Sequence, residues 1–334
     1  MKRRFVLALS IAALGAVFLP GTQEEATAQS AVTLRIATLA PEGSSWMRVF
    51  NAWNNSLRQR TNNTVSLQFY AGGTQGDERD FIRKIRAGQM DGAAVTSTGL
   101  GQVVRPVLVL SAPGLIREYR QLDRVRRRFD RQFRGQFERE GYTLLGWGDV
   151  GKARLFSRRA INQPSDLRSV RPWAWRDDVI FSEFLRVVGA NPVRLGVPEV
   201  YPALQTGMVD TVPSSALAAV SLQWHTRLSH VSQQNSGIII GATILQKARF
   251  DSLSPDQQTA LMETSEQAHQ ALRRAIRRDD DRAYATILRR GITEVDQTPH
   301  QAAWDDAARQ TRERLAGRLY PRSMLDRVAA AVGD

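Results

Sequence analysis

The chain has 334 residues, a formal net charge of +13 and no cysteine. Without cysteine there are no disulfides, thiolate metal ligands or cysteine nucleophiles, yet the chain is long enough to fold around its own apolar core. The positive charge raises the question of nucleic-acid binding. The arginines are spread along the chain, however, and no zinc-knuckle, RNP or helix-turn-helix pattern is present. We therefore expect no nucleic-acid partner.

The N-terminus has the pattern of an export signal. Basic residues precede an apolar run over residues 5–18, and Ala26 and Ala28 form a small-residue cleavage site. This run is shorter than the ~20 apolar residues that a membrane span needs, although a retained membrane anchor is the alternative. We predict that residues 1–28 are a cleavable signal peptide and that the mature protein is periplasmic.

The first part of the mature chain alternates between strand and helix patterns. Strands are predicted over residues 32–38, 65–70 and 91–97. Helices are predicted to begin near Ser44 and at Asp77, because each of these residues is a good N-cap. The aromatic residues of the first helix, Trp46, Phe50 and Trp53, recur at helical spacing and indicate core packing. This rhythm is typical of an α/β domain built on a mostly parallel sheet.

Two longer helices are predicted further along the chain. Residues 117–139 combine apolar positions at helical spacing with many arginines, which we interpret as a solvated basic face. Ser254, Pro255 and Gln257 form the capping-box start of a second helix. A helix of up to ~35 residues spans ~50 Å, so we expect it to brace more than one lobe.

No pattern in the sequence indicates catalysis. The histidines are not spaced as metal ligands on one helical turn, and neither a P-loop nor a GxSxG motif is present. Asp279, Asp280 and Asp281 lie inside the long arginine-rich helix, where adjacent side chains point in different directions, and we interpret them as solvated ion pairs. We expect no catalytic residue, metal or cofactor. A secreted enzyme on a two-lobed α/β fold is the alternative.

Stretches spread over essentially the whole mature chain share one family pattern. They include LRIATLAPEGSSW, VLSAPGLIREYRQLDRV and, most specifically, EVYPALQTGMVD. Together they resemble the substrate-binding proteins of TRAP transporters, the DctP-type family. The resemblance implies two α/β lobes joined by crossing strands and braced by a long helix, with the ligand held between the lobes.

The resemblance also implies the function and the division of the chain. We expect an extracytoplasmic protein that captures a small ligand in the interlobe cleft and delivers it to TRAP-type membrane subunits. A ligand sensor that feeds a receptor is an alternative, and an additional periplasmic partner protein is left open. The first lobe is expected to comprise residues 29–150 plus about 239–278, and the second residues 151–238 plus about 279–334.

One position departs from the family pattern. Most of the family carries an arginine there that binds the ligand's carboxylate as a bidentate salt bridge, whereas DLRSVRPWAW places Trp173 at this position. Because an indole cannot neutralise a buried carboxylate, we expect a neutral or largely apolar ligand, or one stacked between aromatic faces, and a cationic group over an indole is also possible. Binding of a carboxylate by Arg154 or Arg176 is the alternative. Trp175 is expected to face the opposite side of the strand and to pack in the core.

The family pattern suggests further ligand-binding residues. In the first lobe it points to Leu39, Asp77, Thr96 and Ser97, and in the second lobe to Ser214. Leu39 is apolar where relatives carry a polar group, which agrees with an apolar ligand. Thr96 and Ser97 either donate hydrogen bonds to the ligand or cap the segment that follows.

Overall fold

The computed structural model describes residues 31–333, so the predicted signal peptide, residues 1–28, lies outside the described residues. The strands are β1 (Val32–Thr38), β2 (Val65–Tyr70), β3 (Gly92–Thr96), β4 (Tyr142–Ser157), β5 (Trp173–Trp175), β6 (Val193–Leu195), β7 (Thr211–Ser214), β8 (His230–Ser232), β9 (Gly237–Gln246) and β10 (Thr293–Val295). The α-helices are α1 (Ser45–Arg60), α2 (Glu78–Arg86), α3 (Ser97–Val103), α4 (Tyr119–Arg139), α5 (Val179–Val188), α6 (Val197–Thr206), α7 (Ala216–Ser221), α8 (Lys247–Asp251), α9 (Pro255–Arg289), α10 (Gln301–Leu315) and α11 (Arg322–Gly333). The short 3-10 helices are η1 (Arg105–Ser111), η2 (Pro164–Ser169), η3 (Trp224–Arg227) and η4 (Thr298–His300).

The main sheet is mixed. Its strands follow the order β10-β8-β4-β9-β3-β1-β2, and β7 pairs with β4 beside this path. β1 pairs in parallel with both β2 and β3, which confirms the parallel sheet predicted for the first part of the chain. The pairs β3·β9, β4·β9 and β4·β7 are antiparallel. The short strands β5 and β6 form a separate parallel pair.

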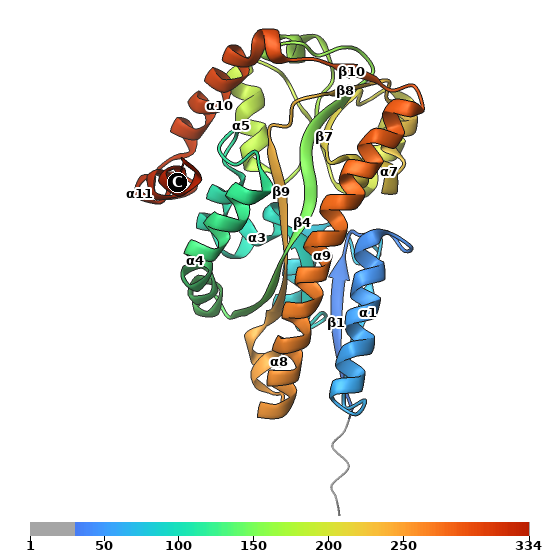
Figure 1. Cartoon of the computed structure of the whole chain (residues 1–334), viewed down its shortest axis with the longest axis vertical. Coiled ribbons are helices and arrows are strands. Elements are labelled where there is room, and N and C mark those ends of the chain that lie inside the picture. The colour runs from blue at the N-terminus through green and yellow to red at the C-terminus, as the bar shows by residue number, and fades with distance from the viewer. Residues whose placement is uncertain (1–30, 334) are drawn as a thin grey trace, which may run out of the picture. The chain divides into compact units, whose positions relative to one another are not determined.

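Two long strands connect the halves of this two-lobed α/β fold. β4 and β9 pair from Tyr142↔Gln246 to Ala153↔Gly237. At one end β9 also pairs with β3, and at the other β4 pairs with β7 and β8. The two halves therefore have both strands in common, and β4 and β9 run together through the middle of the molecule (Figure 1). This confirms the expected crossing strands, while the exact lobe boundaries stay a prediction.

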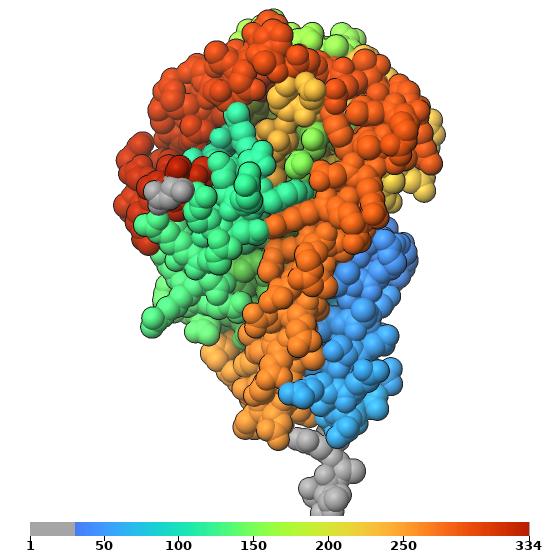
Figure 2. All heavy atoms as spheres, in the orientation of Figure 1, coloured from blue at the N-terminus to red at the C-terminus, as the bar shows by residue number. Residues whose placement is uncertain are grey.

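The helix α9 braces the sheet as predicted. Ser254 caps it through a reciprocal capping box with Gln257, and it packs against β4, α1 and α7. In the space-filling view α9 covers the surface between α4 and α1 (Figure 2). Two glycines of β4 permit the close approach: a Cβ at Gly146 would lie 2.4 Å from the His269 ring, and one at Gly151 would lie 2.6 Å from the Asp280 side chain.

The three aspartates within α9 point in different directions, as expected, but the interpretation of all three as solvated is wrong. Asp280 is fully buried and accepts hydrogen bonds from the backbone amides of Lys152 and Leu217, each at 2.9 Å. It therefore ties α9 to β4 and to the start of α7. Asp281 is exposed and pairs with the ammonium group of Lys152 at 2.9 Å.

The other helix patterns are also confirmed. Apolar residues of α1, α2 and α4 are buried against the sheet, including Trp53, Phe81 and Phe129. On α4, Arg127 and Arg131 are exposed, as a solvated basic face requires, whereas Arg126 is buried. Within residues 31–333, no helix is long and apolar enough to span a membrane.

Candidate functional site

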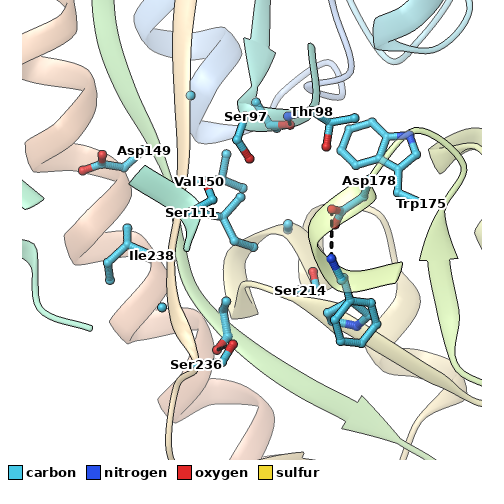
Figure 3. A pocket seen from close by; sticks show the side chains of 18 of the residues that line it. Ser97, Thr98, Ser111, Asp149, Val150, Trp175, Asp178, Ser214, Ser236 and Ile238 are labelled. Carbon is cyan, nitrogen blue, oxygen red and sulfur yellow. Dashed lines mark hydrogen bonds between the residues drawn. The ribbon is translucent and has the colours of Figure 1, made fainter. Parts of the chain in front are cut away.

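A cavity of about 340 Å³ lies where the carboxyl ends of β1 and β3 face the crossing of β4 and β9. Leu39 follows β1, and Thr96 and Ser97 stand at the junction of β3 and α3. Trp173 of β5 and Ser214 of β7 line the other side, and Figure 3 shows Ser97 and Ser214 at its walls. The volume is typical of a small-molecule site, and ligands of α/β sheets bind outside the carboxyl ends of the strands.

Aromatic rings form part of the walls, and we call this space the aromatic cavity. Eight aromatic side chains line it: Trp46, Phe50, Trp173, Trp175, Phe181, Phe184, Trp224 and Trp304. The rings of Trp173 and Trp224 meet edge to face with centroids 5.3 Å apart, and those of Phe184 and Trp304 stack at 6.1 Å. Such contacts stabilise ring positions, so the walls present ordered apolar faces.

Trp173 and Trp175 share one face of β5, so the expectation that Trp175 faces the opposite side is wrong. Side chains two residues apart on a strand point to the same face. Their ring centroids are 6.2 Å apart with an interplanar angle of 27°. Trp173 is only 4 % exposed, and its Nε1 donates to the carbonyl of Leu195 at 3.0 Å. It therefore belongs to the local core as well as to the cavity wall.

Asp77 does not line the cavity. Its Oδ1 caps α2 by accepting from the amide of Glu78 at 2.8 Å, while Oδ2 accepts from Nε1 of Trp175 at 2.8 Å and from the amide of Val197 at 3.1 Å. Burial raises the pKa of Asp77, and the donated hydrogen bonds act in the opposite direction. This carboxylate thus joins α2 to β5 and α6 beside the cavity.

Thr96 and Ser214 direct their hydroxyl groups to the protein itself. Thr96 caps α3 by accepting from the amide of Thr98 at 3.2 Å and donates to Glu78 Oε2 at 3.0 Å. The hydroxyl of Ser214 donates to the carbonyl of Ser215 at 3.0 Å. Of the two roles expected for Thr96, capping is the one present in this structure.

Glu78 is a buried acid in the cavity lining. Burial raises its pKa to about 8, opposed by the hydrogen bonds that it accepts. These come from the amide and hydroxyl of Thr96, at 2.7 and 3.0 Å, and from the amide of Gly99 at 2.7 Å. The carboxyl group is therefore engaged in holding the turn between β3 and α3 against α2.

Two further acids line the cavity, and their surroundings differ. Asp149 forms salt bridges with Arg126 at 2.5 Å and with Arg277 at 2.7 Å, and neither arginine lines the cavity. Asp178 caps α5 and makes no salt bridge within residues 31–333. Burial raises the pKa of Asp178, while the helix amides and the more distant Arg194 lower it.

The two arginines proposed as alternative carboxylate ligands lie elsewhere. Ala153 lines the cavity, whereas the neighbouring Arg154 faces α9, with its guanidinium carbon 4.0 Å from the ring centroid of Tyr284. A one-residue offset on a strand turns a side chain to the other face. Arg176 is exposed and pairs with Glu199 at 2.7 Å. Neither side chain lines the cavity, so this geometry does not favour carboxylate binding by them.

Arg117 is the arginine among the described lining residues, and it is partly engaged, because its buried Nε has no hydrogen-bond partner among the described residues. Its guanidinium group forms a salt bridge with Asp305 of α10. Within residues 31–333, no cluster of three or more histidine and acidic side chains is arranged to hold a metal ion. The site therefore offers apolar faces and hydrogen-bonding groups.

The sequence analysis missed several lining residues. Phe181 and Phe184 were detectable in principle, because they recur at helical spacing just after Asp178, a good N-cap. Trp304 comes from α10, more than a hundred residues beyond β5, and no local pattern relates the two segments. Trp46 was assigned to the core alone, but it also lines the cavity and donates from Nε1 to the carbonyl of Asp149 at 3.1 Å.

Curated relatives cover most of the chain at low identity. The 2,3-diketo-L-gulonate-binding periplasmic protein YiaO of Escherichia coli K12 is 23 % identical over 308 residues, which cover 89 % of this chain and 92 % of that protein. The C4-dicarboxylate-binding periplasmic protein DctP of Rhodobacter capsulatus is 21 % identical, with 78 % and 79 % of the two chains covered.

Solved structures share the fold. A TRAP periplasmic solute binding protein from Shewanella oneidensis, with bound succinate, superposes with a TM-score of 0.85 at 16 % identity, covering 91 % of this chain and all of that one. Another from Roseobacter denitrificans, with bound β-D-glucuronate, has a TM-score of 0.79 at 21 % identity, with 90 % and 99 % covered. The sequence pattern of bacterial extracellular solute-binding proteins, family 7, matches residues 36–317. The chain therefore belongs to this family, the DctP family of TRAP solute-binding proteins.

Proposed function

We propose that this protein captures a small solute in the aromatic cavity and delivers it, chemically unchanged, to TRAP-type membrane subunits. Residues 1–28 act as the export signal that brings it to the periplasm. The lobes that enclose the solute comprise residues 29–150 plus about 239–278, and residues 151–238 plus about 279–334. Hinge motion between such lobes is how a binding protein signals that it is loaded.

We further propose that the solute is neutral or largely apolar. The observation that carries this proposal is the place of Trp173 in the cavity wall, taken together with the family resemblance, which aligns Trp173 with the carboxylate-binding arginine of most of the family. An indole offers an apolar face and one donor, and the Nε1 donor of Trp173 is already used by Leu195. Trp173 can therefore offer a ligand only the apolar face of its ring.

The ionisable groups around the cavity support the same conclusion. Glu78, Asp149 and Asp178 line it, whereas Arg117 is paired with Asp305. A small carboxylate entering this space would lose its water without gaining a free cation, which costs several kcal/mol. Relatives and fold neighbours are named for, or hold, acids such as C4-dicarboxylates, succinate and glucuronate, so a neutral or largely apolar solute would distinguish this chain from them in ligand class.

A calorimetric comparison of solute classes tests the proposal. Wild-type protein is titrated with succinate, as a small acid, and with indole, as a neutral apolar probe. We expect indole to bind and succinate to show no heat of binding. Trp173→Ala should weaken indole binding by more than ~1.5 kcal/mol, because apolar contact is lost. Trp173→Phe, which keeps a ring, should retain most of the affinity.

Two controls make the result decisive. Since Trp173 also packs in the core, circular dichroism and a thermal melt must show that each variant is folded. Trp173→Arg should gain affinity for succinate if the position faces the ligand. Tighter binding of succinate than of indole by the wild type, or unchanged indole affinity in folded Trp173→Ala, contradicts the proposal.

A further inference from the structure

Asp178 places an acid in the wall of the aromatic cavity. It is the N-cap of α5, two residues before Ile180 and three before Phe181, both of which also line the cavity. Its amide donates to the carbonyl of Trp175 at 2.9 Å. Figure 3 shows the carboxylate of Asp178 beside Trp175 at the cavity wall. The acid thus lies in the cavity wall, close in the chain to Trp175 and Phe181, which also line the cavity.

The carboxylate of Asp178 has unused hydrogen-bonding capacity. Oδ1 accepts from the amides of Ile180 and Phe181 at 2.8 and 3.1 Å. Among the described residues, Oδ2 has no hydrogen-bond partner and no salt bridge reaches the group. An ionised carboxylate can accept about four hydrogen bonds. Part of this acid therefore remains available to a group inside the cavity.

The other ionisable groups of the lining are already matched. Asp149 has two arginine partners, the carboxyl group of Glu78 accepts three hydrogen bonds, and Arg117 is paired with Asp305. His269 is fully engaged by Ser265 and Thr243. Among the described lining acids, Asp178 is the one with a carboxylate oxygen that has no hydrogen-bond or salt-bridge partner, because both oxygens of Glu78 and both oxygens of Asp149 are engaged.

Resting on the proposed function, we infer that the solute carries a protonated amine on a largely apolar body. The ammonium group donates to Asp178, and the apolar body packs against Trp175 and Phe181. A cation beside aromatic faces gains from their negative electrostatic potential as well as from the carboxylate. Asp178 thereby becomes a specificity-determining residue: it selects a solute with an ammonium group, whereas the arginine of most of the family selects a carboxylate.

Matched probes and one conservative variant test this inference. The probes are 2-phenylethylammonium, 2-phenylethanol and phenylacetate, which share a ring and similar length but differ in charge. Asp178→Asn removes the charge, and because asparagine caps helices as well as aspartate does, α5 should remain intact. Asp177→Asn is the control, since Asp177 pairs with Arg79 at 3.5 Å and does not line this cavity.

Calorimetry should show that the wild-type protein binds the ammonium probe with higher affinity than the alcohol or the carboxylate. A charge-assisted hydrogen bond corresponds to an affinity for the ammonium probe that is about tenfold or more higher than that for the alcohol. Asp178→Asn should lower the affinity for the ammonium probe by about that factor and change the affinity for the alcohol little. Asp177→Asn should bind all three probes with the affinities of the wild type. Thermal melts must show that both variants are folded.

The outcomes separate this inference from the proposed function. If the alcohol binds best, or if folded Asp178→Asn keeps the wild-type ranking, the amine is wrong and a neutral ligand remains. If phenylacetate binds best, both the amine and the neutral ligand are wrong. Failure of the ammonium probe to bind at millimolar concentration also contradicts the inference.

Discussion

Trp175 donates its indole hydrogen to Asp77 at 2.8 Å, and this bond connects the two predicted lobes beside the cavity. The same oxygen of Asp77 also accepts from the amide of Val197, the first residue of α6, at 3.1 Å. A carboxylate is favourable at a helix N-terminus. Asp77 therefore both positions a cavity-lining ring and connects the two predicted lobes.

Asp77→Ala should open the cleft and shorten the residence of the ligand. Two hydrogen bonds to a charged acceptor are lost across the gap, so we expect the ligand dissociation rate to rise about tenfold or more. Stopped-flow fluorescence measures this rate, and small-angle X-ray scattering should show a larger radius of gyration without ligand.

Asp177→Ala is the matched control for Asp77→Ala. The Arg79–Asp177 pair spans the same gap at 3.5 Å, but Arg79 is exposed, and exposed pairs contribute little. Equal dissociation rates in the two variants would mean that Asp77 is not what holds the lobes together.

Asp280 should contribute far more to stability than the adjacent Asp281. Asp280→Ala leaves the buried amides of Lys152 and Leu217 without an acceptor, which should cost about 2 kcal/mol or more. Asp281→Ala removes an exposed partner of Lys152 and should cost less than about 1 kcal/mol. Urea unfolding compares the two, and similar midpoints would contradict the anchoring role of Asp280.

Arg126 should stabilise the folded protein by compensating the buried charge of Asp149. This arginine is 5 % exposed and donates to Asp149 and to the carbonyl of Gly148. Arg126→Met should cost about 3 kcal/mol, because half of the compensation of a buried carboxylate is lost. Its neighbour Arg127 is exposed, so Arg127→Met should leave the free energy of unfolding nearly unchanged. Chemical denaturation of the two variants measures the difference.

His269 should make stability depend on pH. Burial lowers its pKa from 6.5 to about 4, and its ring donates to Ser265 and accepts from Thr243. Between pH 4 and 6.5 the unfolded chain binds a proton that the folded protein does not, so stability should rise with pH by about 3 kcal/mol across this window. His269→Gln should remove this rise, and parallel wild-type and variant profiles from urea unfolding would contradict it.

The sequence predicted those parts of the fold that depend on local patterns. β1, α1, β2, α2 and β3 follow from alternation, helical spacing and N-caps, and the capping box at Ser254 marks the start of α9. The burial of Asp280 could not be predicted, because it depends on amides of Lys152 and Leu217 that are distant in sequence. A run of three aspartates has no local feature that distinguishes the buried one.

The candidate site was predicted in part. Leu39, Thr96, Ser97, Trp173 and Ser214 lie together around one cavity, although ligand contact by each stays a prediction. The expectation for Trp175 was wrong because the strand rule was misapplied. Side chains two residues apart on a strand share a face, which puts Trp175 beside Trp173. The contributions of α5 and α10 depend on tertiary packing, which brings Phe184 against Trp304.

Native mass spectrometry of the exported protein, followed by identification of the solute released on denaturation, tests the central claim most directly. We predict a bound molecule with a largely apolar body and no carboxylate, with an amine if Asp178 acts as inferred. A small organic acid in the native complex would contradict the claim that Trp173 has replaced the arginine as the main ligand contact.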